Sequence, residues 1–523
     1  MNTAATLPGE PGGTRDEPAS RVLRWRTWLG AGGVAAALYL LTMAPGVLWG
    51  DSGDAQVRVL IGAWSDTRDL ARAHVSFYAL AIFAHRVLQV PAAIAANAVA
   101  ALAGAVTVAN TAVLLRLLIR GRTAWYAGVA VLMCSHTLWQ MSCGAEVVTL
   151  STALLSAELL CMVRYLQTGR RAWLIGAAIA NGLGWTTHNL ALLTWPAYGV
   201  LLLLNRRQLA RQYWRVALGA AAAWGLGALP LIILTVQAFI STGALAQTLR
   251  SLFVGVYARQ VFWHAVGAGT ALRVGAYFLL NFPTPLLLLA PWGWLALRRS
   301  AGRNVWTYLS VAGITYLLFG ARYHVADQYT FLVHAYLFVA LGIAVGAERW
   351  LARFRGAPMR AAVVVLAVTG PMLYALAPAL ARRVHPRFLD SIRAIPHRDE
   401  YAWFLQPWRV GDHGAADFAR EILHALPANA FLYADRTVRE PLEYVQASEH
   451  LRTDIRLIGA QQRSASDRPG FTAQDAADAV THGTLFTTED KPAYLPDWLI
   501  APQWGFERDG PVYRVVRRHV PAP

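Results

Sequence analysis

The sequence has few charged residues and almost no lysine. Charged residues make up 15% of the chain, whereas 56% of it is hydrophobic, which excludes a soluble enzyme with a large core and indicates a polytopic membrane protein. Lys491 is the single lysine, a bias toward arginine that is typical of a GC-rich, bacterial genome. The formal net charge of +17 does not indicate nucleic-acid binding, because the arginines form short clusters between apolar runs instead of one basic face.

Cysteine and cofactor-binding motifs are scarce as well. The three cysteines, Cys134, Cys143 and Cys161, fall in or beside apolar runs, so the sequence predicts neither a disulfide framework nor a zinc site. The polar C-terminal part contains no nucleotide-binding fingerprint, no P-loop and no metal-ligand spacing. The residues alone therefore identify no metal site and no resident cofactor.

Apolar runs long enough to cross a bilayer, which takes about 20 helical residues, are abundant. We expect a polytopic α-helical membrane protein with about eleven transmembrane helices at residues 29–48, 93–118, 124–141, 147–166, 172–187, 189–204, 216–238, 273–297, 305–320, 329–347 and 361–381. The first run follows several arginines and is too long for a signal-peptide core, so it predicts an uncleaved signal anchor. Residues 1–20 are predicted to form a disordered tail before the transmembrane domain, 21–384.

Residues 76–90 are apolar but short, and they could either cross the membrane or lie along its surface. The positive-inside rule decides between the two. If this segment is an interfacial amphipathic helix, most arginine clusters fall on the cytoplasmic side together with the N-terminus. We therefore expect a multi-pass protein of the inner (plasma) membrane, with residues 385–523 on the periplasmic or extracellular side.

Residues 385–523 are predicted to form a small α/β domain outside the membrane. Residues 431–435 and 454–458 have the pattern of buried strands on either side of a helix at 441–451. Two more strands are predicted at 483–487 and 513–516.

The acidic loop after the first span, residues 49–54 (WGDSGD), is the strongest candidate for chemistry. Ionisable groups close to lipid are costly and usually functional. Of the carboxylates of Asp51 and Asp54, one can act as a general base on an acceptor hydroxyl while the other positions it. The same pattern also suits a turn or a helix N-cap, and the pair alone favours that structural interpretation.

Three more polar residues fall on the same predicted outer face. His74 closes the acidic loop, Glu146 opens the fourth span, and His188 interrupts two apolar runs. Each also has a structural interpretation. His74 can be an ordinary satisfied polar group, Glu146 can be an acid that favours a helix N-terminus, and His188 can mark a structural hinge.

The loop 322–328 is the last polar group on this face. Arg322 has a planar guanidinium that suits a phosphate oxygen. It could equally form an ion pair with Asp327 that closes the loop, and both interpretations can hold at once.

In their order along the chain, these segments resemble the GT-C superfamily of membrane glycosyltransferases, and more narrowly its protein O-mannosyltransferase-like branch, formerly a domain of unknown function. Members carry an aspartate-serine-glycine-glutamate motif after the first span, which residues 51–54 match with Asp54 in place of glutamate. They then carry a His-Pro-Pro-Gly segment before an interfacial helix, where this chain keeps His74 and has Val75-Ser76-Phe77 instead. Residues 145–147, 184–188 and 426–454 are also similar, so the resemblance extends through most of the chain.

The resemblance implies an inverting transfer of a sugar from a polyprenyl-phosphate donor to an acceptor hydroxyl at the outer membrane face. It implies Asp51 as the base and Asp54 as its partner, with the reverse assignment nearly as good. The implied phosphate-binding residues are His74, His188 and Arg322, and the implied pocket residues are Glu146, Asp327 and Gln328. The long loop 239–272 could cover the site.

The implied partners are membrane lipid, a lipid-linked sugar donor, and an acceptor that is a protein, a glycan or a lipid. Use of a divalent metal stays open, because some GT-C enzymes use one and others do not. A transporter or flippase would need charged residues at mid-membrane depth, whereas here the ionisable groups gather at helix ends on one side. A non-catalytic scaffold on the same fold predicts that Asp51 and Asp54 are dispensable.

Overall fold

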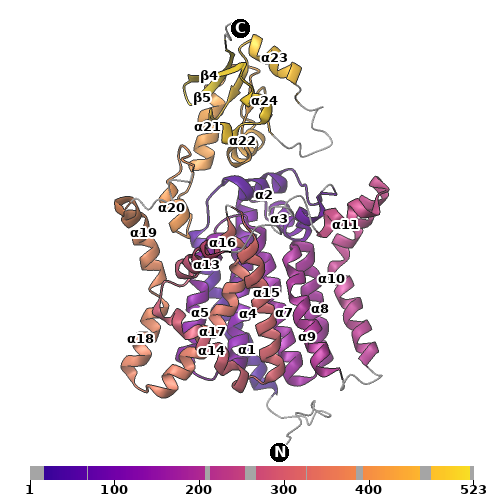
Figure 1. The fold of residues 1–523 in the computed structure, drawn as a ribbon, viewed down its shortest axis with the longest axis vertical. Coiled ribbons are helices and arrows are strands. Elements are labelled where there is room, and N and C mark those ends of the chain that lie inside the picture. The colour runs from indigo at the N-terminus through magenta and orange to yellow at the C-terminus, as the bar shows by residue number, and fades with distance from the viewer. Residues whose placement is uncertain are drawn as a thin grey trace, which may run out of the picture.

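The computed structural model describes residues 17–67, 69–206, 213–253, 267–325, 327–384, 393–459, 471 and 473–518. Most of them are helical and form one bundle, with a small sheet region beyond one end of it (Figure 1). The bundle and its flanks contain α1 (Glu17–Thr42), α4 (Ala92–Leu118), α5 (Arg122–Met133), α6 (His136–Ser142), α7 (Val147–Thr168), α8 (Arg171–Thr187), η2 (Asn189–Thr194), α9 (Trp195–Asn205), α10 (Tyr213–Thr242), α13 (Ala268–Asn281), η3 (Pro285–Leu288), α14 (Leu289–Ser300), α15 (Arg303–Arg322), α17 (Val333–Arg353), α18 (Ala357–Ala367) and α19 (Gly370–Val384).

Four helices of the described chain are long and apolar enough to cross a membrane on their own: α4, α7, α17 and the Trp214–Thr242 part of α10. The pair α18 and α19, bent by 47°, could form a fifth span. The predicted number of eleven spans is therefore not confirmed.

Several of the predicted spans are broken, and two of these breaks have a clear local cause. The run 124–141 divides into α5 and α6 at Ser135, whose hydroxyl bonds the Leu132 carbonyl and competes with the helix. The run 273–297 divides into α13, η3 and α14 around Pro283 and Pro285, because proline lacks the amide hydrogen that a helix needs. The first helix also ends early, at Thr42, shortly before Pro45 and Gly46.

The predicted disordered tail falls on residues outside the described chain up to residue 16, but residues 17–20 already belong to α1, so that part of the prediction is wrong. Part of the predicted covering loop, residues 254–266, also lies outside the described residues.

Short elements lie at the end of the bundle that faces the sheet: α2 (Gly50–Leu60), η1 (Leu70–Arg72), α3 (Val75–Leu88), α11 (Leu245–Phe253) and α16 (Gln328–Phe331) (Figure 1). The predicted interfacial segment forms α3 as a separate helix. Its Phe77 and Tyr78 are buried while Leu80 and Phe83 are exposed, so apolar side chains lie on both its inner and its outer face.

The C-terminal region, residues 393–518, holds a sheet of order β2-β1-β3-β5-β4. β1 (Phe431–Tyr433) pairs in parallel with β2 (Arg456–Ile458) and β3 (Leu485–Thr487). β5 (Val512–Arg517) is antiparallel to both β3 and β4 (Trp504–Asp509). The predicted strands are confirmed, while β4 was not foreseen. The helical elements of this region are α20 (Glu400–Leu405), α21 (Gly414–Ala425), α22 (Arg436–Ser448), α23 (Ala473–Thr481), η5 (Pro492–Tyr494) and α24 (Asp497–Ile500).

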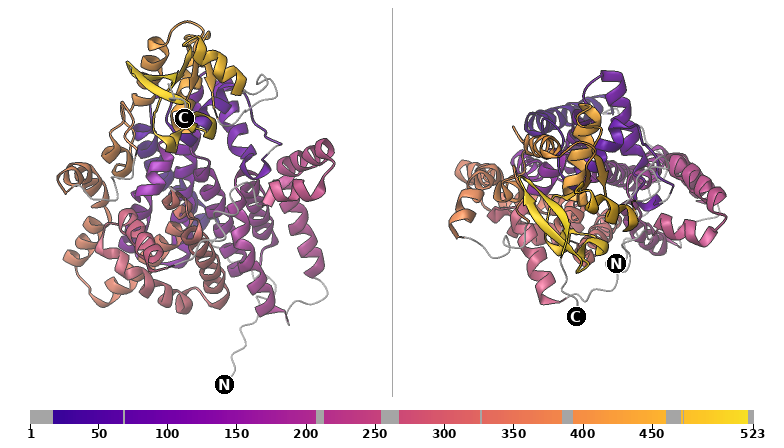
Figure 2. Two further views of the ribbon diagram at one scale, coloured as in Figure 1. Left: turned by 45° about the horizontal axis from the view of Figure 1, so that its top comes forward. Right: turned by 90° about the horizontal axis from the view of Figure 1, so that it is seen from above.

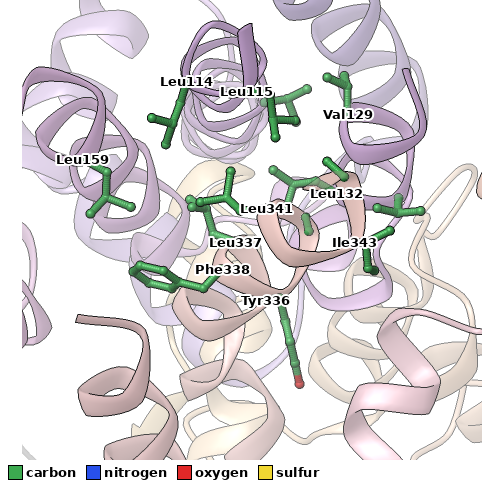
Figure 3. Packing of buried hydrophobic residues seen from close by; sticks show 14 of the residues in the cluster. Leu114, Leu115, Val129, Leu132, Leu159, Tyr336, Leu337, Phe338, Leu341 and Ile343 are labelled. Atoms are coloured by element: carbon green, nitrogen blue, oxygen red, sulfur yellow. The ribbon is translucent and has the colours of Figure 1, made fainter. Parts of the chain in front are cut away.

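Two large apolar cores position the parts of the molecule. One fills the bundle, where Leu115, Leu159 and Leu341 pack between helices (Figure 3). The second core is shared between the bundle end and the C-terminal region, and includes Val57 and Phe77 together with Phe418 and Leu442. Seen from above, the C-terminal region covers the middle of the bundle, while α10 and α11 extend to one side (Figure 2).

Candidate functional site

Helix α2 carries the acidic motif at the bundle end, directly below the C-terminal region (Figure 1). The chain enters it through the extended residue Trp49 and the left-handed Gly50, and Asp51 then occupies the first turn, where a negative charge favours the helix dipole. Asp51, Asp54 and Arg58 share one face of α2 because of their helical spacing. The Asp51 side chain is 65% exposed, and the Asp54 side chain 15%.

Arg436, the first residue of α22, contacts both predicted catalytic carboxylates. Its Nη2 lies 2.7 Å from Oδ1 of Asp51 and 3.1 Å from Oδ2 of Asp54. The sequence analysis did not identify Arg436, because nothing in the local pattern around it differs from an ordinary amphipathic helix. The structure thus adds a cation from the C-terminal region to the acidic pair.

Gly53 explains why the motif contains a glycine between its acids. A Cβ at this position would lie 2.7 Å from the Cβ of Glu440 on α22 and 2.5 Å from the Leu48 carbonyl oxygen. Only glycine therefore lets α22 approach α2 this closely.

Glu146 joins the site through the same helix. The hydroxyl of Ser52 donates a 2.7 Å hydrogen bond to Oε1 of Glu146, which precedes α7. Burial raises the pKa of Glu146 to about 8, and the charges of Asp51 and Asp327 add to the rise against the opposing Ser52 bond. A carboxyl group of this kind is protonated at neutral pH.

Asp327 and Gln328 lie between α15 and α17. Solvent reaches Asp327, yet partial loss of water around its carboxylate and the nearby charge of Asp51 raise its pKa. The buried Gln328 donates from Nε2 to the carbonyls of Gly320 and Ala321, at 3.0 and 2.8 Å, and so caps the end of α15. Asp327 is therefore near the acidic helix, whereas the amide of Gln328 serves the fold.

The two predicted histidines stack on each other, with ring centroids 5.4 Å apart. Nδ1 of His74 donates to the Thr187 carbonyl at 2.6 Å, and Nδ1 of His188 accepts from the Leu190 amide at 3.2 Å. Burial and the neighbouring His188 hold the pKa of His74 well below its usual value. These bonds leave the neutral His188 with a proton on Nε2, a donor for an anionic ligand.

Arg58 is a second residue that the sequence analysis did not select. Its guanidinium carbon lies 3.9 Å from the ring centroid of Tyr78, and its charge acts on the nearby His74. Within the described chain, its buried Nη2 atom has no hydrogen-bond partner. An unmatched buried donor on a cation is costly, so this atom is suited to meet an anionic ligand.

Arg322 is the exposed last residue of α15, at the start of the loop that holds Asp327. Beside it, Nη2 of Arg273 donates to Nδ1 of His324 at 2.9 Å. Arg322, Arg273 and His324 thus form a group of basic residues at the bundle end that also carries Arg58. The phosphate-binding role of Arg322 stays a prediction.

Among the described residues, no group of three His, Cys, Asp or Glu side chains could hold a metal ion. The charged pair at the centre of the site is bound by a guanidinium instead. Use of a divalent metal stays a prediction.

One acid lies inside the bundle, contrary to the expectation that ionisable groups gather only at helix ends. Glu158 is buried in the middle of α7, accepts a 2.9 Å bond from Nδ2 of Asn181, and is bonded by the hydroxyls of Tyr198 and Tyr308. Asn181, Tyr198 and Tyr308 belong to α8, α9 and α15, so Glu158 connects α7 to these three helices. Buried polar groups that are satisfied in this way fix helix packing.

The comparisons with known proteins agree with this architecture. Residues 74–211 match the family model described as the protein O-mannosyl-transferase TMEM260 N-terminal domain. ArnT from Cupriavidus metallidurans in the apo state superposes with a TM-score of 0.59 at 14% identity, over 95% of this chain and 98% of that chain. ArnT from the same organism bound to undecaprenyl phosphate gives 0.56 at 13% identity, with coverage of 95% and 98%. No curated protein sequence matches the chain.

These findings confirm the predicted resemblance to the GT-C glycosyltransferases and their O-mannosyltransferase-like branch. The chain has the GT-C fold over nearly its whole length. The family match includes His74, Glu146 and His188, while the acidic motif on α2 lies just before it.

Proposed function

We propose that this protein is an inverting glycosyltransferase that moves a sugar from a polyprenyl-phosphate donor to an acceptor hydroxyl at the outer face of the inner membrane. The observation that carries the proposal is the exposed Asp51 beside Asp54 on one face of α2, at the bundle end that meets the C-terminal region. The GT-C fold and the O-mannosyltransferase family match support it, as does the binding of undecaprenyl phosphate by ArnT.

In the proposed reaction, the Asp51 carboxylate removes the proton of the acceptor hydroxyl. The acceptor oxygen forms a bond to the anomeric carbon while the bond from that carbon to the phosphate oxygen breaks. The electron pair leaves with the polyprenyl phosphate, and the configuration at the anomeric carbon inverts. Protonated Asp51 then returns its proton to water. Asp54 positions Asp51, and exchange of these two roles gives the same chemistry.

The leaving phosphate gains negative charge, so it needs fixed donors that are already in place. Arg58 with its unmatched Nη2 and His188 with its Nε2 proton supply such donors, and His74 holds the stack in place through Thr187. Arg322, at the end of α15, is proposed to add a further positive charge.

Glu146 and Asp327 are proposed to line the pocket beside Asp51. Glu146, protonated at neutral pH, offers a neutral carboxyl there, which avoids a third negative charge next to the base. We further propose about eleven spans with broken helices among them, a cytoplasmic N-terminus and an outer C-terminal region. The sugar is proposed to be mannose or a related hexose, on the basis of the family match.

The test is transfer of labelled sugar from a panel of polyprenyl-phosphate hexoses, in membranes that carry the wild type, Asp51→Asn or Asp54→Asn at matched levels. Loss of the base should lower transfer and donor hydrolysis by about 10²- to 10⁴-fold. Asp417→Asn is the matched control, because Asp417 is an exposed, ion-paired aspartate on α21. Activity that is indifferent to both site substitutions would remove Asp51 and Asp54 from the catalytic assignment, and absence of activity with every donor would favour the non-catalytic scaffold.

A further inference from the structure

We propose that Arg436 is a positioning residue for this transfer, because its guanidinium holds the Asp51 carboxylate in one orientation with one oxygen left for the acceptor. This inference rests on the proposed function. It assigns to the C-terminal region a direct part in the catalytic site, beyond docking on the bundle.

The contact geometry suits a clamp. A single nitrogen, Nη2, donates a hydrogen bond to Oδ2 of Asp54 and lies within ion-pair distance of Oδ1 of Asp51. A carboxylate has two oxygens, so the contact at Oδ1 leaves Oδ2 of Asp51 for a hydroxyl proton. An aspartate as exposed as Asp51 would otherwise exchange among rotamers.

The start of α22 is itself held in place by neighbouring residues of the C-terminal region. The Asp435 side chain caps α22 by accepting from the Thr437 amide at 3.0 Å, and Arg393 forms an ion pair with Asp435. Nε of Arg393 lies 3.5 Å from Oε2 of Glu489, and these side chains are 10 to 16% exposed. Arg436 therefore extends toward α2 from a backbone that partly buried ion pairs fix to the sheet.

Docking of α22 on the bundle does not need the Arg436 contacts. Gly53 lets α22 approach α2 closely, the Tyr444 hydroxyl accepts from the Ala93 amide at 3.0 Å, and the rings of Trp49 and Phe418 lie 5.3 Å apart. These groups belong to or adjoin the shared apolar core. An ion pair to a carboxylate as exposed as Asp51 adds little to stability, so the contribution of Arg436 is to geometry.

The experiment uses the full-length protein in membrane vesicles, with undecaprenyl-phosphate mannose as the probe donor. Arg436→Ala, Arg436→Gln and Arg436→Lys are compared with Arg420→Gln, which removes an ion-paired arginine on α21 of the same region. We expect Arg436→Ala to lower kcat by about 10- to 100-fold through loss of orientation, with donor KM nearly unchanged. Arg436→Lys should keep part of kcat, since it keeps the charge but not the planar fork.

Chemical rescue separates positioning from a structural role. Guanidinium ion at tens of millimolar should restore part of the kcat of Arg436→Ala and none of that of Asp51→Asn. Thermal unfolding followed by tryptophan fluorescence verifies that each variant is folded, and Arg436→Gln, which keeps more of the side chain than alanine does, replaces the alanine variant if that one is unstable.

The outcomes distinguish the two proposals. If the wild type transfers sugar while Arg436→Ala behaves like Arg420→Gln, the positioning role is wrong and the proposed function stands. A rise in acceptor KM at unchanged kcat would also overturn it, because it would assign Arg436 to acceptor binding. Absence of wild-type activity with every donor of the panel would remove the proposed function, and this inference with it.

Discussion

The hydroxyl of Ser52 donates a 2.7 Å hydrogen bond to Oε1 of Glu146, which ties α2 to the start of α7. Ser52 lies between the two candidate catalytic aspartates, so this bond connects the acidic helix to a carboxyl group whose pKa burial raises to about 8. The protonation of Glu146 is therefore coupled to the position of α2.

Glu146 should make the stability of the protein depend on pH. The folded-state pKa of about 8 lies above the ordinary value of 4.5, so the folded state binds more protons between these values and stability falls as pH rises through this window. Relative to Glu146→Gln, the free energy of unfolding of the wild type should fall by at most about 1.4 kcal/mol for each pH unit, and this fall should end above about pH 8.

The measurement is denaturant unfolding in detergent between pH 5 and pH 9, followed by tryptophan fluorescence. Glu507→Gln, which changes an exposed glutamate on β4, is the control and should track the wild type. Parallel curves for the wild type and Glu146→Gln would contradict the raised pKa.

Replacement of Arg58 should lower the catalytic efficiency with the sugar donor. Its guanidinium packs on Tyr78 and has an unmatched buried Nη2 atom in the described chain. A charged hydrogen bond to phosphate contributes about 1.5–3 kcal/mol, so Arg58→Gln should lower kcat/KM for the donor by about 10- to 150-fold. Steady-state donor kinetics test this, with the exposed Arg360→Gln on α18 as the matched control. Equal kinetics for the two variants would exclude Arg58 from the phosphate site.

Hydropathy predicted much of the fold because long apolar runs have few alternatives in a membrane protein. The run 93–118 became α4 almost unchanged, and the short segment 76–90 became α3. The breaks at Ser135 and around Pro283 were missed, although a serine and two prolines signal them. A hydropathy window averages over such residues, whereas the backbone responds to each one.

The site could be predicted only where its chemistry is local in sequence. Asp51 and Asp54 were found because two acids beside an apolar run are unusual. The contact of Arg436 with them joins distant parts of the chain, and no local pattern identifies it. Glu158 was overlooked even though a single acid inside an apolar run is visible in the sequence, and its four-helix network depends on tertiary packing.

A substitution at His188 can separate the roles of its two ring nitrogens. Asparagine places its amide oxygen near the position of Nδ1, so His188→Asn should keep the bond from the Leu190 amide and lose the Nε2 proton. We expect normal stability with kcat lowered by about 10²-fold, as when one preorganised donor is removed from a developing negative charge. His482→Asn, in the C-terminal region, is the control. Unchanged kcat in His188→Asn would restrict His188 to a structural hinge.

Gly53→Ala should separate α22 from α2. The added methyl group would lie 2.7 Å from the Cβ of Glu440 and 2.5 Å from the Leu48 carbonyl oxygen, and neither backbone can move without disturbing the shared core. Overpacking of this kind costs about 1–3 kcal/mol, and the displacement would lengthen the contact of Arg436 with Asp51. We therefore expect a lower unfolding temperature together with reduced kcat.

Gly33→Ala is the control for this substitution, because a Cβ at Gly33 in α1 meets nothing within 4 Å. Alanine also favours a helix over glycine, so this variant should be at least as stable as the wild type. Thermal unfolding and transfer kinetics measured on both variants test the close approach. If Gly53→Ala were as stable and as active as Gly33→Ala, α22 would not rest on α2, and the glycine of the acidic motif would need another explanation.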